Sequence, residues 1–230
     1  MKIGVFGTGV VGRTISEKLI TLGHEVMMGT RDVKTTLSRT ESGRYGQPSY
    51  SEWHKKNPQV KIGPFGETAK FGEFLISALL GAGSLPALNL AGSENMANKI
   101  LLDISNPLDF SKGMPPSLLV SNTDSMAEQI QRAYPDMKVV KSLNTVTAYV
   151  MVNPGQIDED HQIFVNGNDE EAKKQVCKLL NSFGWKNDNI IDLGDITASR
   201  GVEQYLPLWV RILSKFQNPL FNIKIVWAKP

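Results

Sequence analysis

Short apolar runs alternate with amphipathic segments along most of the chain. The runs typical of buried strands lie at residues 2–6, 25–29, 74–80, 100–104 and 138–143. Apolar positions at helical spacing predict helices between them, over residues 10–22, 85–95 (with Ser84 as N-cap) and 125–134. Because such alternation favours right-handed crossovers between parallel strands, the pattern predicts an α/β fold with a doubly wound, mainly parallel sheet.

The C-terminal part continues with shorter elements. There the spacing of apolar residues predicts a strand over 162–165, a helix over 170–183 closed by Gly184 and a strand over 190–193. A long helix over 197–216 and a terminal strand over 221–227 follow. The long helix has so few polar positions that we expect it to be largely buried, in the domain or in a dimer interface. We therefore predict a doubly wound domain over 1–150 and a small C-terminal α/β annex over 151–230 that completes a substrate cleft.

The turn after the first strand reads Gly7-Thr8-Gly9-Val10-Val11-Gly12, a G-x-G-x-x-G pattern between a strand and a helix. In dinucleotide-binding folds the first glycine allows a tight turn and the second lets the backbone approach a pyrophosphate. The third lets the helix pack closely on the strand. The helix that begins near Val10 directs free N–H groups and its positive dipole end at the phosphates. This segment therefore predicts a Rossmann-type dinucleotide site.

The end of the second strand indicates which dinucleotide binds. An NAD enzyme places a carboxylate there for the ribose hydroxyls, whereas an NADP enzyme places a cation for the 2′-phosphate. Thr30 and Arg31 stand at this position and Lys34 adds positive charge, so we expect a preference for NADP(H). Asp32 leaves an alternative open. It can be interpreted as the ribose-binding carboxylate of an NAD site, displaced by two positions from the end of the strand.

Three further strand ends belong to the same predicted edge, since ligands of such sheets bind at the carboxyl ends of the strands. They are Ala78-Leu79-Leu80-Gly81, Ser105-Asn106-Pro107 and Ser142-Leu143-Asn144-Thr145. The last two are our candidates for the nicotinamide and substrate end.

A polar stretch over 32–70, with several glycines and prolines including Gly43 and Gly46, interrupts the alternation. Residues 51–56 predict a short helix and residues 60–62 a short strand. A connection this long is functional or is an insertion with its own structure. It lies over the adenine end of the cofactor, meets a partner subunit, or is a plain surface insertion.

The composition restricts the kinds of partner and the cellular location that we expect. The chain has 230 residues and a formal net charge of +2, which gives no reason to expect nucleic acid or a membrane surface as partner. No apolar stretch reaches the ~18 residues of a membrane span, and no signal peptide is expected before the first strand. Cys177 is the single cysteine, which excludes internal disulfides and cysteine metal clusters, and we expect a buried structural thiol. A cytoplasmic location fits this pattern.

The side chains commonly used for hydrolysis are missing, since the sequence has neither H-E-x-x-H nor G-x-S-x-G. We expect structural or surface roles for the histidines. His161 precedes a strand and is therefore expected at the wrong end of the sheet; the other two are His24 and His54. Lys141, inside a strand, is expected to be buried and paired, and Arg200 and Glu203 are expected to pair with each other. No catalytic residue and no metal ligand is predicted.

The same inventory separates two kinds of reaction. Hydroxyacid dehydrogenases need a lysine or histidine as proton carrier beside the substrate hydroxyl, often within a G-x-x-G-x-G-x-x-x-K-x-x-N helix that this sequence lacks. Hydride transfer between two flat heterocyclic carriers needs stacking, alignment and exclusion of water. Serine, asparagine, threonine and backbone amides at the strand ends suit the second case.

The chain resembles the NADP oxidoreductase family that uses the deazaflavin coenzyme F420, and the nucleotide-binding domain of the six-transmembrane epithelial antigen ferric reductases. The resemblance covers most of the chain and rests on residues 3–12, 29–31, 103–108, 125–128, 139–145, 193–203 and 221–224. It implies phosphate contacts from Thr8, Val10 and Val11, and a 2′-phosphate site of Thr30, Arg31 and Lys34. It also implies that residues 78–80 and 142–145 follow the ribose and nicotinamide, and that no protein acid or base is obligatory.

We therefore expect an NADP-dependent oxidoreductase, as a homodimer, that transfers a hydride between NADPH and a heterocyclic acceptor. The resemblance implies coenzyme F420 or a flavin as co-substrate, but the stretch 32–70 is longer than in the archetypal enzymes, which leaves the acceptor open. A ferric chelate or a small carbonyl compound is an alternative acceptor. Reduction of a small carbonyl or imine substrate, or a non-catalytic role as an NADP(H)-binding sensor, are the alternative functions.

Overall fold

The computed structural model describes residues 1–42 and 47–228, so Gly43 and Gly46 of the polar stretch lie outside the described residues. The strands are β1 (Lys2–Phe6), β2 (Glu25–Thr30), β3 (Lys61–Pro64), β4 (Phe74–Ser77), β5 (Ile100–Asp103), β6 (Leu108–Asp109), β7 (Ser117–Leu118), β8 (Lys138–Ser142), β9 (Ile163–Gly167) and β10 (Ile190–Asp192). The helices are α1 (Val10–Thr21), α2 (Val33–Leu37), α3 (Tyr50–Lys56), α4 (Phe65–Phe71), α5 (Gly81–Ala91), α6 (Ser93–Met96), α7 (Met126–Ala133), α8 (Ala148–Val152), α9 (Glu170–Phe183), α10 (Ser199–Gln204) and α11 (Leu206–Phe216). Short 3₁₀ turns lie at Pro154–Gln156, Asn187–Asn189 and Ile196–Ala198.

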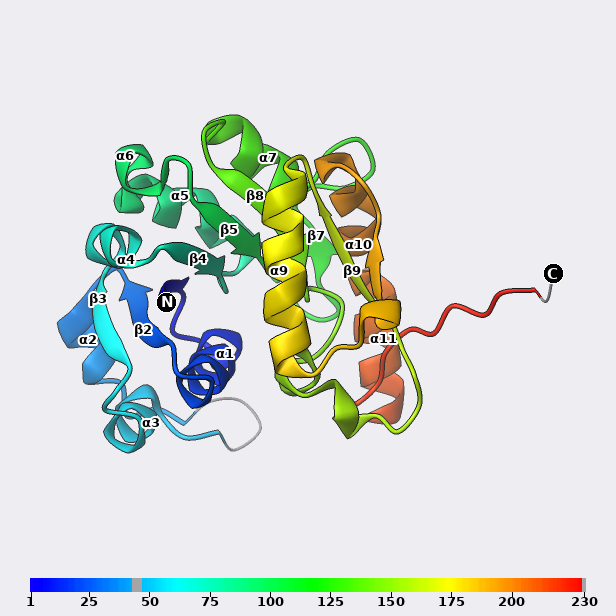
Figure 1. Ribbon diagram of the computed structural model, residues 1–230. Coiled ribbons are helices and arrows are strands. Elements are labelled where there is room, and N and C mark those ends of the chain that lie inside the picture. The colour runs from blue at the N-terminus through cyan, green and yellow to red at the C-terminus, as the bar shows by residue number, and fades with distance from the viewer. Residues whose placement is uncertain (43–46, 229–230) are drawn as a thin grey trace.

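Eight of these strands form a sheet in the order β10-β9-β8-β5-β4-β1-β2-β3, and β6 and β7 form a separate antiparallel hairpin (Figure 1). Neighbours from β3 to β8 are parallel, whereas β9 is antiparallel to β8 and β10 is parallel to β9. The chain leaves β1 toward β2 and β3, then returns to β4 on the other side of β1. This reversal lies at β1 and β4, where open α/β sheets bind ligands. The predicted fold, doubly wound and mainly parallel, is confirmed.

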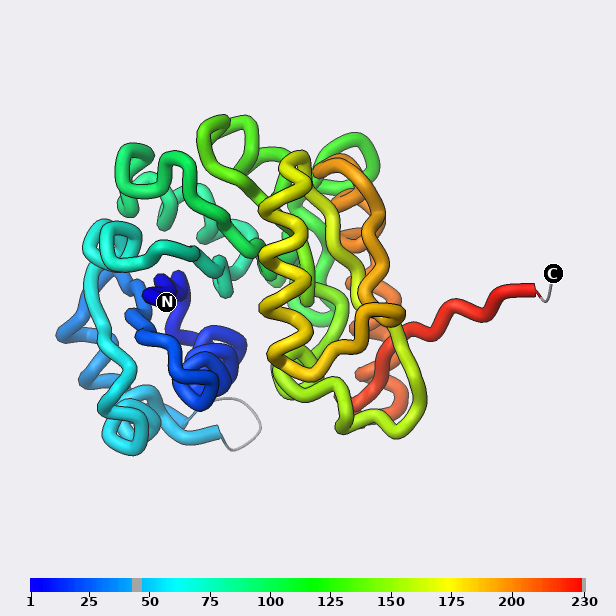
Figure 2. The backbone as a smooth tube through the Cα atoms, in the orientation of Figure 1, coloured from blue at the N-terminus to red at the C-terminus, as the bar shows by residue number. Residues whose placement is uncertain are grey.

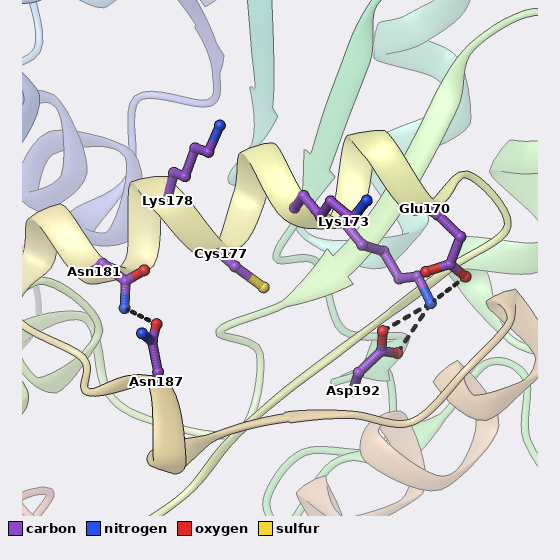
Figure 3. A pocket seen from close by; sticks show the side chains of 8 residues that line it. Glu170, Lys173, Cys177, Lys178, Asn181, Asn187 and Asp192 are labelled. Carbon is purple, nitrogen blue, oxygen red and sulfur yellow. Dashed lines mark hydrogen bonds and ion pairs between the residues drawn. The ribbon is translucent and has the colours of Figure 1, made fainter.

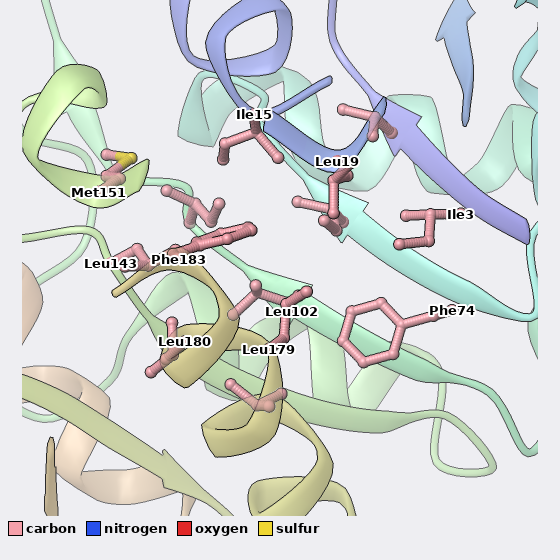
Figure 4. Close-up of a cluster of buried hydrophobic side chains, with 14 of the residues drawn as sticks. Ile3, Ile15, Leu19, Phe74, Leu102, Leu143, Met151, Leu179, Leu180 and Phe183 are labelled. Atoms are coloured by element: carbon pink, nitrogen blue, oxygen red, sulfur yellow. The ribbon is translucent and has the colours of Figure 1, made fainter. Parts of the chain in front are cut away.

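Helices cover both faces of the sheet. On one face α1, α8 and α9 pack their apolar side chains on alternate strand residues, as Ile15, Leu102 and Phe183 illustrate (Figure 4). On the other face α4, α5 and α7 pack on the intervening strand residues, among them Leu75 and Leu101. Because the central strands are covered on both sides, their sequences read as continuous apolar runs.

The stretch 32–70 belongs partly to the sheet itself. β3 forms the edge strand beside β2, and α4, which the sequence analysis did not predict, packs on β1 and β2. Gly29 permits this packing, because a Cβ at that position would lie 2.9 Å from the ring of Phe65. α2 and α3 fill the rest of the described stretch, and α3 buries Tyr50 and Trp53 in the same core cluster as Ile15 of α1. The idea of one continuous insertion is therefore wrong for residues 61–70.

The C-terminal part differs from the prediction at several points. β9 and β10 extend the same sheet, and the division at residue 150 stays a prediction. The long helix is divided into α10 and α11, and α11 buries only Leu206 and Val210, while Leu208 is 57% exposed. The expected burial is therefore wrong for the described chain taken alone. No strand forms over 221–227. Phe221 stacks on Trp209, and Asn222 and Ile225 bond to residues that precede β9. The chain then extends from the body of the molecule, with Trp227 79% exposed (Figure 2).

Helix starts depend on local chemistry that the spacing of apolar residues does not reveal. The predicted start at residue 85 is wrong, because α5 begins at Gly81 and Ser84 lies within its first turn. α7 and α9 begin as predicted, with the Ser125 and Asp169 side chains accepting from backbone N–H groups. Within the described residues, every helix is too short or too polar to cross a lipid bilayer.

Candidate functional site

The glycine turn after β1 has the geometry that a dinucleotide requires. Gly7 has a φ of +113°, and a Cβ there would lie 2.5 Å from the carbonyl oxygen of Ala78. A Cβ at Gly12 would lie 2.1 Å from the oxygen of Gly7, so α1 approaches the turn as closely as a glycine allows. A Cβ at Gly9 would meet nothing within 4 Å, which leaves the backbone open at the start of α1. The nearby predicted residues Thr8, Val10, Val11 and Leu79 are all half-buried.

The end of β2 presents the predicted hydroxyl and cations. Thr30 is buried, and its Oγ1 lies 2.7 Å from Oγ1 of Thr36 on α2. Arg31 and Lys34 are exposed, and neither forms an ion pair with any residue the structure describes. β2 is the direct neighbour of β1, so this positive end lies one strand away from the glycine turn. The arrangement fits a nucleotide with a phosphate on the adenosine ribose.

Asp32 has a role that the sequence analysis did not assign to it. Its Oδ1 accepts a hydrogen bond of 2.8 Å from the backbone N–H of Thr35, which makes Asp32 the N-cap of α2. Backbone hydrogen bonding from Thr35 holds the pKa of Asp32 below its ordinary value. One oxygen of the carboxylate is therefore used to begin α2, a role that the interpretation of Asp32 as a displaced ribose-binding acid does not explain.

Arg39 is a cation of this region that the sequence analysis missed. Its Nη1 donates to Oγ1 of Thr8, and its Nη2 donates to Oγ1 of Thr36, both at 3.2 Å. The guanidinium thus connects the glycine turn with α2. Nothing in the sequence spacing indicates this contact, because it depends on where α2 places the residue after its C-terminal end.

Backbone contacts tie the end of β4 to the end of β1, and the start of α5 to the end of β5. The N–H of Ala78 donates to the carbonyl oxygen of Phe6 at 2.8 Å, and the N–H of Gly81 donates to that of Asn106 at 3.0 Å. Leu80 is the N-cap residue of α5 and is 65% exposed. The predicted residues 78–80 therefore border the turn, and Leu80 presents an exposed apolar surface beside it.

The ends of β5 and β8 are joined by two asparagine side chains. Nδ2 of Asn144 donates to Oδ1 of Asn106 at 2.9 Å and to the carbonyl oxygen of Val202, and Nδ2 of Asn106 donates to the carbonyl oxygen of Asn144. Oγ of Ser142 donates to the carbonyl oxygen of Phe164 at 2.6 Å. The structure thus uses Ser142 and Asn144 to fix the edge, whereas the sequence analysis assigned them to the cofactor.

Three buried hydroxyls at the same strand ends have no partner among the described residues. They are the side chains of Ser77, Ser105 and Thr145, at the ends of β4, β5 and β8. A buried hydroxyl without a hydrogen bond costs about 1–3 kcal/mol, so such groups are uncommon in a finished core. Their position at the carboxyl edge fits contact with a polar ligand.

Lys141 is buried and paired as predicted. Its Nζ lies 2.8 Å from Oδ2 of Asp103 and 2.8 Å from Oε1 of Glu203, and it also donates to the carbonyl oxygen of Ser105. Burial alone would lower the pKa of Lys141, but the two carboxylates outweigh it and raise the pKa above its ordinary value. The ammonium group is therefore held in its charged form inside the protein, paired with two carboxylates.

The predicted pairing of Arg200 with Glu203 is wrong. Arg200 donates through Nη2 to Oε1 of Glu128 at 2.6 Å, and Glu203 faces Lys141 instead. The two residues are three apart, but at the start of α10 they project toward α7 and β8 respectively. Helical spacing alone does not reveal such long-range partners.

The histidines lie outside the candidate site, although one prediction about them fails. His161 was expected at the wrong end of the sheet, but β9 is antiparallel, so residues before β9 lie at the carboxyl edge of β8. His161 is buried, with Nε2 bonded to the carbonyl oxygen of Pro154 and Nδ1 to Asn222. Both ring nitrogens are thus used internally. His24 precedes β2 and His54 lies on α3, as expected.

The described surface includes hollows on two sides of the molecule. One, of about 390 Å³, is lined by α9 and β10 residues including Lys173, Cys177 and Asp192 (Figure 3). This hollow lies at the edge of the sheet far from β2. Cys177 was expected to be buried but is half-buried, and the burial it has raises the pKa of its thiol. The other, of about 190 Å³, lies beside the start of α1 and is lined by Val10 and Tyr149.

A segment of the polar stretch crosses beside this second hollow. Nη1 of Arg13 on α1 donates to the carbonyl oxygen of Pro48 at 2.7 Å, and Nε2 of Gln47 donates to the hydroxyl of Tyr149 on α8 at 3.1 Å. These contacts connect the first turns of α1 with α8, which follows the end of β8. The polar stretch therefore borders the side of the candidate site.

Comparison with known proteins places this geometry in a family. The family described as "NADP oxidoreductase coenzyme F420-dependent" matches residues 2–107. The F420-dependent NADP reductase of Methanocaldococcus jannaschii is 32% identical over 163 residues, which is 69% of this chain and 70% of that protein. A crystal structure from Arthrobacter sp. FB24, of a candidate F420-dependent NADP-reductase, is 50% identical with a TM-score of 0.93, covering 99% of this chain and 100% of the other.

A second group of relatives is larger than this chain. Metalloreductase STEAP3 of Rattus norvegicus is 27% identical over 212 residues, and the chain spans 38% of its length. A reductive aminase from Aspergillus terreus, 16% identical with a TM-score of 0.62, shares the fold alone.

The extent of the first group of matches, joined to the glycine turn and the cationic end of β2, establishes the assignment: the chain is an NADP-dependent oxidoreductase that belongs to the coenzyme F420-dependent NADP oxidoreductase family.

Proposed function

We propose that the protein transfers a hydride between NADPH and a flat heterocyclic acceptor, either a deazaflavin of the F420 type or a flavin. The observation that carries the proposal is the chemistry of the strand ends beside the expected nicotinamide. They offer serine and threonine hydroxyls and asparagine amides, whereas the side chain of Lys141 is held between Asp103 and Glu203. Hydride transfer between two heterocycles requires alignment and a dry site, and no protein proton carrier.

Different residues would bind different parts of NADPH. The backbone at Gly9 and the first turn of α1 would hold the diphosphate, and Thr30 with Arg31 would hold the 2′-phosphate. Bound NADPH would supply the hydride. The exposed Leu80 and the unpartnered hydroxyl of Thr145 would border the nicotinamide, one excluding water and the other orienting a polar group.

The acceptor is tested by stopped-flow oxidation of enzyme-bound NADPH against coenzyme F420, FMN, FAD, a ferric chelate, and panels of carbonyl and imine compounds. We expect rapid single-turnover oxidation with F420 or a flavin, and slow reaction with carbonyls and imines. Fast reduction of a carbonyl or imine would favour that alternative activity. Tight NADPH binding with no turnover on any acceptor would favour a sensor. The Arg31→Ala variant is the control, because it should lose the reaction through weaker NADPH binding.

A ferric chelate is included because of the metalloreductase relatives, although this chain spans only part of their length. If reduction of the chelate requires added flavin, the flavin is the direct acceptor of the hydride. Direct reduction without flavin would contradict the proposal, since a hydride carries two electrons and a ferric ion accepts one.

We also propose that the protein forms a homodimer and is cytoplasmic. α11 and the segment after it expose Leu208, Phe216, Val226 and Trp227, a set of large apolar side chains that a second copy would cover. The single cysteine fits a reducing compartment. Light scattering during size-exclusion chromatography tests the dimer, and Leu208→Glu should convert it to a monomer if this surface forms the interface.

A further inference from the structure

Arg39 is held between the two segments that border the expected adenosine ribose. Its Nη1 donates to Oγ1 of Thr8 in the glycine turn, and its Nη2 donates to Oγ1 of Thr36 on α2, each at 3.2 Å. Thr36 in turn lies 2.7 Å from Thr30, the residue at the end of β2. Three threonine hydroxyls and one guanidinium therefore form a continuous set across the ends of β1 and β2.

The backbone of Arg39 is anchored as well. Its N–H donates to the carbonyl oxygen of Thr36 at 3.3 Å, and its own carbonyl oxygen accepts from the N–H of Ser51 at 3.1 Å, next to the start of α3. The side chain thus extends from a fixed point toward the nucleotide side of the sheet. A guanidinium placed in advance loses less side-chain entropy when it binds an anion.

The charge of Arg39 is not neutralised by its partners. Both hydroxyls are neutral, and in the part of the chain that the structure describes no carboxylate lies within ion-pair distance of Arg39. A guanidinium has five N–H donors, and the structure uses two of them. Asp32, the acidic residue nearest in sequence to Arg31, is occupied as the cap of α2. Donors and charge therefore remain for an anion.

We propose that Arg39 is a second guanidinium for the 2′-phosphate of NADPH, acting together with Arg31. Arg31 follows the end of β2 directly, whereas Arg39 reaches the same region from the end of α2, so the phosphate would be held from two segments. Arg39 would then determine specificity, because NADH has no group at this position. This inference rests on the proposed NADPH site, and the experiment below separates the two.

The test measures the affinity of purified protein for four probes by calorimetry: NADPH, NADH, 2′,5′-ADP and 5′-AMP. The variant is Arg39→Gln, which keeps amide donors for Thr8 and Thr36 but removes the charge, and Arg39→Lys keeps the charge without the planar fork. We expect Arg39→Gln to weaken NADPH and 2′,5′-ADP by about 10-fold or more, with NADH and 5′-AMP changed less than about twofold. Arg39→Lys should lie between the variant and the wild type.

The matched control is Arg132→Ala, which removes an exposed arginine on α7 that pairs with Asp124 and should leave all four affinities unchanged. Equal weakening of phosphorylated and unphosphorylated probes by Arg39→Gln would overturn the inference, since that result indicates adenine stacking or a structural role. An unchanged NADPH affinity would overturn it too. If the wild-type protein binds neither NADPH nor 2′,5′-ADP, the proposed function itself fails. Thermal unfolding of each variant verifies that it is folded.

Discussion

The ammonium nitrogen Nζ of Lys141 lies 2.8 Å from Oε1 of Glu203, with both side chains buried at the carboxyl edge of the sheet. The same carboxylate accepts the backbone N–H of Met126 at 2.8 Å, at the start of α7. One glutamate of the C-terminal part therefore fixes β8, α7 and α10 to one another. This contact holds the strand ends that border the candidate site in a defined position.

Breaking this contact should be costly. Glu203→Gln removes one of the two negative charges that face Lys141, and breaking a buried pair typically costs about 3–5 kcal/mol. We expect a loss of about 3 kcal/mol in the free energy of unfolding, measured by urea denaturation. Glu25→Gln is the control, because it breaks the exposed pair with Lys61 and should cost less than about 1 kcal/mol. Similar small losses in both variants would show that the buried pair does not stabilise the fold.

Substitutions of Gly9 and Gly12 in the turn should have different effects. Gly12→Ala places a methyl group 2.1 Å from a backbone oxygen, so we expect a destabilised protein with a lower melting temperature. Gly9→Ala has free space around the new methyl group in the described structure and should fold normally. It should nevertheless bind NADPH much more weakly, because the methyl group occupies the place of the diphosphate. Normal NADPH affinity in Gly9→Ala would place the diphosphate elsewhere.

Most of the sheet could be predicted from the sequence, because strands buried on both faces read as apolar runs and the turn glycines have distinct physical roles. α4 could not, since Phe65–Phe71 is short and its burial depends on the close approach that Gly29 allows. The antiparallel direction of β9 could not be predicted from the hydrophobic pattern either, because tertiary pairing decides the direction of a strand.

In the candidate site, too, local features could be predicted from the sequence and long-range contacts could not. The glycine turn and the Thr30-Arg31 end were predicted, as both are contiguous in sequence and carry their own chemistry. Arg39 was missed because its contacts with Thr8 and Thr36 depend on the position of α2. The internal roles of Ser142 and Asn144 were missed because their partners, Phe164 and Val202, lie in the C-terminal part.

Arg31 should decide between the two nicotinamide nucleotides. Arg31→Ala removes an exposed guanidinium next to the ribose position, and one charge-assisted phosphate contact corresponds to about a 10- to 100-fold change in affinity. We expect that loss for NADPH and little change for NADH, measured by quenching of protein fluorescence. Asp32→Ala is the companion variant, because it removes the cap of α2 and should lower the melting temperature without reversing the nucleotide preference. A variant Asp32→Ala that loses NADH binding would restore the alternative reading of this acid.

Acid should weaken the fold partly through Asp124. Its carboxylate accepts two hydrogen bonds from Arg132, which lowers its pKa from 3.8 to about 2 in the folded protein. Between these values the unfolded chain binds a proton that the folded chain does not, so stability decreases as the pH falls from about 4 to about 2. Because Arg132 is largely exposed, we expect Asp124→Asn to cost only about 1 kcal/mol at pH 7. The variant should then show a shallower loss of stability below pH 4 in urea titrations, and an unchanged slope would contradict this assignment.

The most direct test of the whole account is isothermal titration of the wild-type protein with NADPH and with NADH. The account predicts one NADPH site per chain with a dissociation constant in the micromolar range or below, and NADH at least about 10-fold weaker. Absence of heat up to about 1 mM NADPH, or equal affinity for the two nucleotides, would contradict the claim that the glycine turn and the cationic end of β2 form an NADP(H) site.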